Sequence, residues 1–147
     1  MHQTPTPTER RSPWLTLAVL CASVFIIVVD GTIVNVALPT FVRELGATTS
    51  QLQWIVDAYV LVFAGLLMAA GSIGDRFGRK GTLMIGMAAF GATSILASLA
   101  TTPGQLIAWR AAMGVGAALI FPATLAILVN VFTNARERAI AISIWAA

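Results

Sequence analysis

Long apolar stretches alternate with short polar segments along the chain, and four of the stretches are long enough to cross a membrane. These four run over residues 14–38, 52–73, 83–100 and 106–132, and a helix needs about 20 apolar residues to span the hydrocarbon core. A fifth stretch, 139–147, covers roughly 14 Å at 1.5 Å per residue, about half of that core. The pattern predicts an all-α integral membrane protein with four complete transmembrane helices and the start of a fifth.

The fifth stretch also bears on the organisation of the chain. A helix that ends halfway across the bilayer leaves its last carbonyl groups unpaired in lipid. We therefore expect an N-terminal fragment, whose partners include missing C-terminal helices of the same chain. Residues 1–13 are polar and rich in Thr and Pro, which predicts a disordered cytoplasmic tail. Residues 14–147 then form a truncated N-terminal transmembrane bundle.

Composition agrees with a membrane location and excludes two other classes. Only 10% of the 147 residues are charged and 58% are hydrophobic, whereas soluble domains carry about 25% charged residues. So few charges cannot cover the large surface of a small soluble domain. Disorder of the whole chain is excluded because it requires low hydrophobicity and high net charge.

The distribution of cations predicts the orientation. Seven of the nine Lys and Arg residues lie in three segments, and an even number of predicted spans separates each of these segments from the next. The segments hold Arg10 and Arg11, then Arg76, Arg79 and Lys80, then Arg136 and Arg138. Arg43 lies on the opposite side and Arg110 lies inside a span. The positive-inside rule then predicts a multi-pass protein of the plasma (cell inner) membrane with a cytoplasmic N-terminus. Nucleic acid is not an expected partner, because its binding needs cations gathered on one soluble face.

Three ionisable residues lie inside the predicted spans: Asp30, Asp57 and Arg110. Each costs about 2.5–3.5 kcal/mol at a helix centre on insertion scales, so each is a candidate functional residue. Counted from the outer ends of their spans, Asp30 lies roughly 12 Å deep and the other two roughly 7–8 Å deep. These depths predict a cavity in the outer half of the membrane, lined by two carboxylates and one guanidinium.

Such a charge set has three possible roles. Burial and a nearby arginine act in opposite directions on the proton affinity of a carboxyl group, which could bind a proton on one side of the membrane and release it on the other. The carboxylate could instead pair with a cationic substrate. The third role is structural, an Asp–Arg ion pair that only holds helices together.

The fourth span carries small residues at a regular spacing after its arginine. The arginine and these residues recur every four positions and therefore lie on one face of the helix: Arg110, Gly114, Ala118 and Pro122. Small residues at this spacing let helix backbones approach closely, and Gly116 adds another. Pro122 should kink the helix near its middle. Gly114 and Gly116 do not form a dinucleotide-binding fingerprint, because Leu119 stands where a third glycine is required.

The most specific signal is the loop after the second span, where glycines alternate with charges. Its candidate residues are Gly71, Gly74, Asp75, Arg76, Gly78, Arg79 and Lys80. The glycines permit a tight reversal between two helices, and the cations suit a cytoplasmic interface. Asp75 should pair with a cation or cap a helix N-terminus. The loop lacks the G-x4-G-K spacing of a phosphate-binding loop.

Two segments resemble motifs of the major facilitator superfamily. Residues 71–83 are similar to its signature loop, with Ile73 and Gly74 as mild departures. Residues 106–118 are similar to its second motif, in which Met113 replaces the usual Gln. These two motifs specify the superfamily strongly.

Two further segments resemble one branch of the superfamily. Residues 30–39, D-G-T-I-V-N-V-A-L-P, are similar to the span 1 motif of the drug:proton antiporters with fourteen spans. Residues 54–59 resemble the second span of multidrug pumps that expel quaternary ammonium compounds and dyes. The resemblance implies a partial N-terminal helix bundle of the major facilitator fold, and transport by alternating access.

The resemblance also implies a function and a role for each candidate residue. The function is proton-coupled efflux (antiport) of drugs or other lipophilic, cationic compounds, with protons as the coupling ion and no metal or other cofactor. Arg110 would serve proton coupling, Asp30 coupling or substrate binding, and Asp57 the binding of cationic drugs. The charged loop would form a cytoplasmic conformational latch, to which Arg136 or Arg138 is a candidate addition. Candidate aromatic contacts for a cation, each with packing or lipid contact as the alternative, are Phe25, Trp54, Tyr59 and Phe121.

Two other functions stay open. The chain could belong to a transporter of another small solute or metabolite, against which the span 1 motif argues. It could also be a non-transporting membrane receptor or structural subunit, against which the intramembrane charges argue. An enzyme is not expected, because the predicted spans hold no histidine, no nucleophile–base pair and no metal-ligand cluster.

Overall fold

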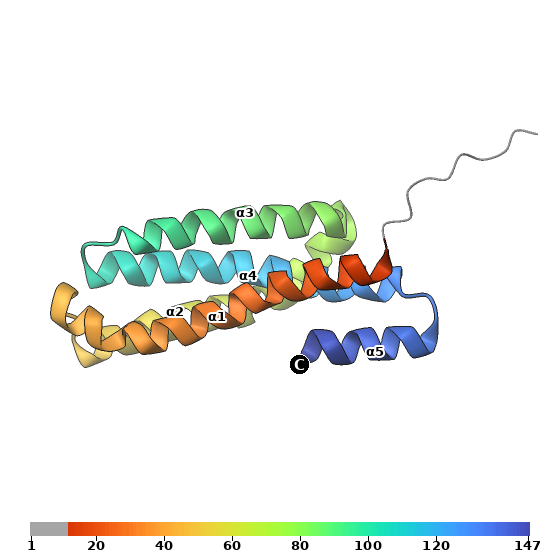
Figure 1. Cartoon of the computed structure of the whole chain (residues 1–147). Coiled ribbons are helices and arrows are strands. Elements are labelled where there is room, and N and C mark those ends of the chain that lie inside the picture. The colour runs from red at the N-terminus through yellow and green to blue at the C-terminus, as the bar shows by residue number, and fades with distance from the viewer. Residues whose placement is uncertain (1–11) are drawn as a thin grey trace, which may run out of the picture.

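The computed structural model describes residues 12–147, which form five helices (Figure 1). The helices are α1 (Pro13–Leu45), α2 (Thr49–Phe77), α3 (Arg79–Ser98), α4 (Pro103–Val131) and α5 (Ala135–Ala146). The predicted tail falls almost entirely on residues 1–11, which lie outside the described residues. Among the described residues, α1 to α4 are each long and apolar enough to cross a membrane. The predicted all-α fold, with four membrane-spanning helices followed by a shorter fifth, is confirmed.

Most helix ends lie beyond the apolar stretches of the sequence because capping residues, rather than hydrophobicity, end the helices, although α3 and α4 end one or two residues inside their stretches. α1 continues through Pro39 to Leu45 and stops at Gly46, whose φ of 62° places it in the left-handed region. α2 begins with a capping box in which the Thr48 hydroxyl accepts from the Gln51 N–H at 3.3 Å and the Gln51 side chain accepts from the Thr48 N–H at 3.0 Å. Polar ends of this kind suit the interfacial zone on either side of the hydrocarbon core.

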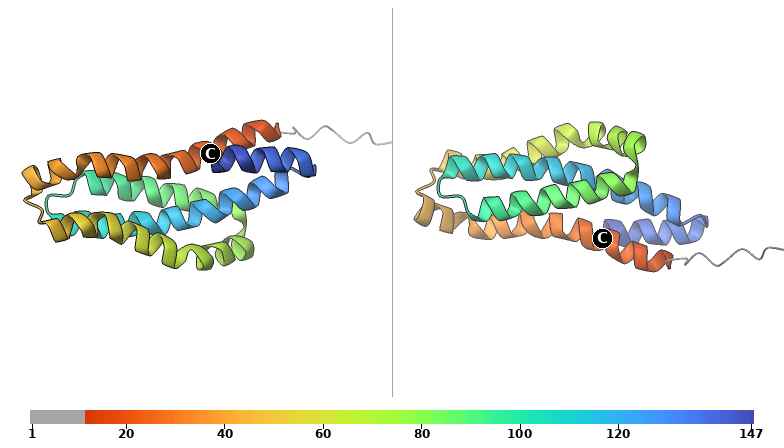
Figure 2. Two further views of the ribbon diagram at one scale, coloured as in Figure 1. Left: turned by 90° about the horizontal axis from the view of Figure 1, so that it is seen from below. Right: turned by 90° about the horizontal axis from the view of Figure 1, so that it is seen from above.

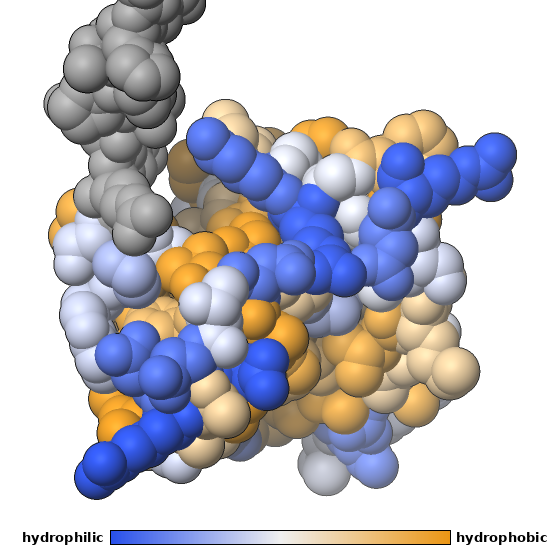
Figure 3. Space-filling view, turned by 90° about the vertical axis from the view of Figure 1, so that its right-hand side faces the viewer, coloured by the Kyte–Doolittle hydropathy of each residue, from blue (hydrophilic) through white to orange (hydrophobic). Residues whose placement is uncertain are grey.

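Helix α4 is the centre of the bundle. It packs along α2 and α3 and also contacts α1 and α5 (Figure 2). Its buried side chains are mostly small or apolar, and α4 stays one continuous helix through Pro122. The α2–α3 turn, the α4–α5 turn and the start of α1 lie at the same end of the bundle (Figure 1). Hydrophilic side chains gather over that end (Figure 3).

The middle of the bundle is filled by one cluster of buried residues from four helices. It consists of Ile27, Tyr59, Phe90, Met113, Ala117 and Ile120. A second cluster joins α1, α4 and α5 towards the hydrophilic end, and a third joins α1, α2 and α4 towards the opposite end. The candidate charged residues are therefore set into an apolar interior, where an unpaired charge is costly.

Candidate functional site

The small residues of α4 bring its backbone against two neighbouring helices. A Cβ atom added to Gly114 would lie 2.7 Å from the Tyr59 carbonyl oxygen of α2, and one added to Gly116 would lie 2.9 Å from the Phe90 nitrogen of α3. The predicted face continues along α2, because Pro122 lies against Gly71 and Ala118 lines a small hollow shared with α2. Gly116 lies outside that face and packs on α3 instead. Because the helix backbones pack this closely, Arg110, at the start of the face, lies against α2.

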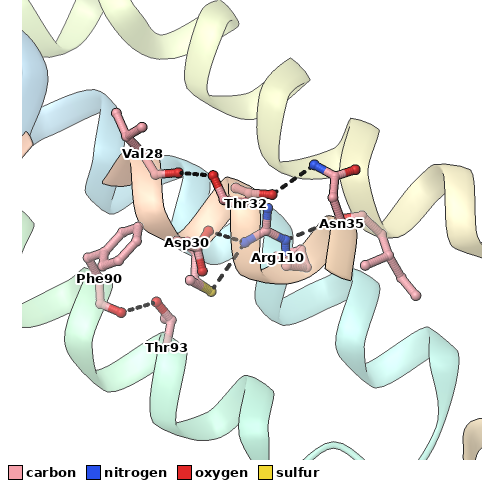
Figure 4. A network of polar contacts seen from close by, with 10 residues as sticks. Val28, Asp30, Thr32, Asn35, Phe90, Thr93 and Arg110 are labelled. Carbon is pink, nitrogen blue, oxygen red and sulfur yellow. Dashed lines mark hydrogen bonds and ion pairs between the residues drawn. The ribbon is translucent and has the colours of Figure 1, made fainter. Parts of the chain in front are cut away.

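Arg110 joins three helices from inside the bundle (Figure 4). Its side chain is almost fully buried, and its Nη1 group forms an ion pair and hydrogen bond with Oδ2 of Asp30 on α1. Its Nε–H donates to the carbonyl oxygen of Ile55 on α2 at 3.1 Å. The guanidinium thus has one charged partner and one neutral partner on two different helices. Removing the Asp30 carboxylate would leave the buried charge of Arg110 uncompensated.

Two further side chains enclose the guanidinium. The Arg110 Cζ atom lies 4.3 Å from the centroid of the Tyr59 ring, a cation–π contact. The Met113 sulfur lies 3.9 Å from Nη1, so the residue that replaces Gln in the motif supplies a soft contact in place of a polar one. Sequence reasoning left packing as the alternative for Tyr59 and gave Met113 and the Ile55 carbonyl no part in the site. Every residue carries a carbonyl, so no sequence signal marks that of Ile55.

Asp57 does not join the pair. Among the described residues, no hydrogen bond or ion pair connects its half-buried side chain to Asp30 or Arg110. The reason is helical periodicity: Asp57 lies two residues from both Ile55 and Tyr59, which face Arg110, so it points to the opposite side of α2. The expected cavity lined by two carboxylates and one guanidinium is therefore wrong for this part of the chain.

Two cavities flank α1 near the pair. A cavity of about 200 Å³ between α1 and α3 reaches Asp30 and is also lined by Phe25, Phe90 and Ser94. A larger one, about 660 Å³, lies between α1, α4 and α5. Its lining is almost wholly apolar: Cys21, Ala22, Val24, Phe25, Val28, Phe121, Ile144, Trp145, Ala146 and Ala147. Phe25 lines both cavities and so separates the larger one from the carboxylate.

A row of aromatic rings connects the arginine with the larger cavity. The ring centroids of Tyr59 and Phe63 are 6.2 Å apart, those of Phe63 and Phe121 are 5.9 Å apart, and those of Phe121 and Trp145 are 5.0 Å apart. The indole of Trp145 also donates to the Thr124 hydroxyl at 3.3 Å. Of the predicted aromatic contacts, Phe25 and Phe121 line the larger cavity and Tyr59 contacts Arg110. Trp54 is half exposed and lines neither of the two cavities.

The charged loop forms the turn between α2 and α3. Gly78 takes a φ of 98°, which L side chains rarely adopt, and is the single residue between the end of α2 and the start of α3. Asp75 pairs with Arg79 at 3.0 Å. A second nitrogen of Arg79 donates to the Ala126 carbonyl of α4 at 3.1 Å. This hydrogen bond connects the turn to the part of α4 that follows Pro122.

The other loop residues have separate contacts. Gly74 packs against Thr82, and the Arg76 guanidinium lies 5.9 Å from the centroid of Phe77. Lys80 lines a groove of about 340 Å³ beside α1. Arg136 and Arg138 form no ion pair within the described part of the chain, so the structure does not bring them to Asp75. Nor do residues 12–147 contain a group of three or more His, Cys, Asp or Glu side chains that could hold a metal ion.

A comparison with protein-family models decides the family. Residues 20–147 match the model described as Major Facilitator Superfamily. The chain belongs to this superfamily. With the four apolar helices, membership indicates a multi-pass membrane protein of a transporter family that takes small molecules, rather than an enzyme.

Curated relatives from the Major Facilitator Superfamily carry names of efflux and resistance proteins. The chain is 43% identical over 144 residues to the multidrug efflux pump LfrA of Mycolicibacterium smegmatis, covering 96% of this chain and 29% of LfrA. It is 41% identical over 141 residues to the puromycin resistance protein pur8 of Streptomyces alboniger (96% and 28%). It is also 41% identical over 134 residues to the methyl viologen resistance protein SmvA of Salmonella typhimurium (91% and 27%). The chain thus spans less than a third of the length of these relatives.

Proposed function

We propose that this chain forms the first helices of a proton-coupled exporter that removes lipophilic cations by alternating access. The observation that carries the proposal is the ion pair between the buried Arg110 and the half-buried Asp30, which joins α4 to α1 in an apolar interior. Ionisable groups inside membrane helices are costly and mark ion or substrate pathways. The names of the relatives support an efflux role, since they refer to multidrug efflux and to resistance to puromycin and methyl viologen.

Proton coupling follows from the chemistry of this pair. When Asp30 takes up a proton it loses its charge, and Arg110 loses its only charged partner among the described contacts. The neutral Ile55 carbonyl and the Tyr59 ring still hold the guanidinium on α2, so α1 is the helix that is released. Protonation therefore weakens the link between α1 and α4, and loss of the proton restores it.

The size and lining of the larger cavity support a lipophilic, cationic substrate. Its volume of about 660 Å³ lies within the range of about 300–1,000 Å³ that drug-sized ligands use. The apolar lining and the faces of Phe25, Phe121 and Trp145 suit a flat, lipophilic cation. Asp57 lies outside this cavity, and we propose that it meets a cationic substrate with helices of the same chain beyond residue 147.

The α2–α3 turn would act as a conformational latch at the cytoplasmic side of the plasma membrane. Asp75 and Arg79 hold the turn, and Arg79 also holds α4. This arrangement lets the turn respond when α4 moves relative to α2 and α3. In this proposal protons are the coupling ion, no other cofactor takes part, and the N-terminus is cytoplasmic.

The decisive test replaces Asp30 by Asn in the complete protein that contains these 147 residues. Asn keeps the size of the side chain but binds no proton, so proton-gradient-driven efflux of a cationic dye or of methyl viologen should fall to background. Glu44→Gln is the matched control, because Glu44 is exposed near the end of α1 and should leave efflux unchanged. Wild-type efflux rates in Asp30→Asn would exclude Asp30 from the mechanism. Proton-driven uptake of a nutrient, with no effect on drug tolerance, would favour the solute transporter instead.

A further inference from the structure

The hydroxyl group of Tyr59 is buried without a hydrogen-bond partner. It is the one buried side-chain polar atom of the described residues in this condition, and the whole residue is only 7% exposed. An unpartnered buried hydroxyl is costly, which is why nearly all buried polar groups find a partner. A phenylalanine would fill the same apolar cluster without that cost. We therefore expect the Tyr59 hydroxyl to have a hydrogen-bond partner in another conformational state of the protein.

The neighbours of Tyr59 identify that partner. Arg110 lies over the Tyr59 ring, 4.3 Å from its centroid, and the same guanidinium holds Asp30. The other groups packed on the ring are apolar: Phe63 is stacked on it, and the surrounding cluster contributes Ile27 from α1, Phe90 from α3 and Met113 from α4. Asp30 thus supplies the only side-chain oxygen acceptor among these described contacts, since the Met113 sulfur is a weak acceptor.

We propose that Tyr59 is a positioning residue that exchanges with Arg110 as the partner of Asp30. In the state seen here Arg110 occupies the Asp30 carboxylate and the Tyr59 hydroxyl is unpaired. When the ion pair opens, the hydroxyl forms a hydrogen bond with the freed carboxyl group, while the guanidinium stays on the Ile55 carbonyl and the Tyr59 ring. The unpaired hydroxyl destabilises the closed pair and the new hydrogen bond stabilises the open one, so both effects favour opening. This inference rests on the proposed proton coupling.

The test is Tyr59→Phe in the complete protein, reconstituted in vesicles with a pH gradient. Phenylalanine keeps the ring under Arg110 and removes only the hydroxyl. We expect proton-driven efflux of methyl viologen to slow about tenfold, whereas substrate–substrate exchange, which needs no change at Asp30, stays within twofold of wild type. The melting temperature should be equal or higher, because the unpaired hydroxyl is gone. If the hydroxyl had a purely structural role, its loss would not slow proton-driven efflux while leaving substrate–substrate exchange unchanged.

The matched control is Thr93→Val. The Thr93 hydroxyl donates to the Ala89 and Phe90 carbonyls of its own helix, so both transport modes should stay at wild-type rates. Equal proton-driven rates in Tyr59→Phe and wild type would overturn the role of Tyr59 and leave the proposed function intact. Equal slowing of both modes would overturn it as well. If wild-type efflux does not respond to the pH gradient, the proposed function fails, and the inference fails with it.

Discussion

Arg110 shows how a single charged side chain is accommodated inside an apolar bundle. A charge at the centre of a membrane helix costs about 2.5–3.5 kcal/mol on insertion scales. Here the guanidinium contacts the Asp30 carboxylate of α1 and, on α2, the Ile55 carbonyl and the face of the Tyr59 ring. Only the carboxylate carries charge, so the electrostatic balance of the interior depends on the protonation state of Asp30.

The approach of Arg110 to α2 depends on the absence of a side chain at Gly114. A Cβ atom there would lie 2.7 Å from the Tyr59 carbonyl oxygen and 3.1 Å from the Val62 Cβ atom. Gly114→Ala must therefore push α2 and α4 apart, with an overpacking cost of about 1–3 kcal/mol. We expect a lower melting temperature of the complete protein in detergent, measured by tryptophan fluorescence.

Gly91→Ala is the control for this substitution. Gly91 also lies inside a helix, but nothing lies within 4 Å of its added Cβ atom. Alanine forms helices better than glycine by about 1 kcal/mol, so Gly91→Ala should not lower the melting temperature. If both variants melt at the same temperature, the α2–α4 contact at Gly114 is looser than described.

The sequence predicted part of this site because charge and hydrophobicity are visible in it. Asp30 and Arg110 stood out as ionisable residues at comparable depth, and the structure joins them. Asp57 stood out for the same reason, but depth does not fix the direction in which a helical side chain points. The aromatic row from Tyr59 to Trp145 depends on contacts among α2, α4 and α5, which no short-range pattern encodes.

At the scale of elements, hydrophobic length predicted the number and order of the helices but not their ends. Most ends lie at polar or glycine caps outside the apolar stretches: Gly46, Thr48, Gly78, Thr102 and Asn134. The C-terminal caps of α3 and α4, Leu99 and Phe132, lie within the stretches. A hydropathy pattern marks where lipid begins, whereas a helix ends where its terminal backbone groups find other partners. The small residues of the fourth span predicted a close approach of helix backbones but not the packing order, in which α4 lies at the centre through close contacts with α2 and α3.

The α2–α3 turn offers a test at this scale. The Arg79 guanidinium contacts Asp75 with Nε and Nη2 and the Ala126 carbonyl with Nη1. Lysine in its place has one nitrogen on a flexible stem and cannot keep this geometry. We expect Arg79→Lys to increase hydrogen–deuterium exchange in the turn and in α4 around Ala126. The melting temperature should change little, since the Arg79–Asp75 pair is exposed.

Arg76→Lys is the matched control for the turn. The Arg76 guanidinium lies near the Phe77 ring of its own helix, so its replacement should leave exchange around Ala126 at the wild-type level. Unchanged exchange in Arg79→Lys would mean that the guanidinium does not tie the turn to α4.

At the scale of the whole molecule, hydrophilic side chains gather at one end of the bundle (Figure 3), and five of the seven cations of the described residues lie at that end. The α2–α3 turn contributes Arg76, Arg79 and Lys80, and the start of α5 contributes Arg136 and Arg138. Arg43, near the end of α1, lies towards the opposite end. The sequence predicted this asymmetry from the order of its segments alone, because consecutive spanning helices must alternate in direction.

The asymmetry leads to a prediction of orientation. The positive-inside rule places the end with the α2–α3 and α4–α5 turns in the cytoplasm. We therefore expect Thr101→Cys, between α3 and α4, to react with a membrane-impermeant maleimide in intact cells. Thr133→Cys, between α4 and α5, should react only after permeabilisation. Both positions are exposed, so accessibility of the side chain itself does not distinguish them.

The background for this experiment is the complete protein with Cys21→Ser and any other cysteine replaced, so that each label reports one position. The parent without an introduced cysteine should stay unlabelled in both conditions. Labelling of Thr133→Cys in intact cells with protection of Thr101→Cys would reverse the orientation. It would put the Asp75–Arg79 turn outside the cell, and Asp30 would then take up its proton from the wrong side for export. The orientation therefore decides whether the ion pair, the larger cavity and the turn can operate together as an exporter.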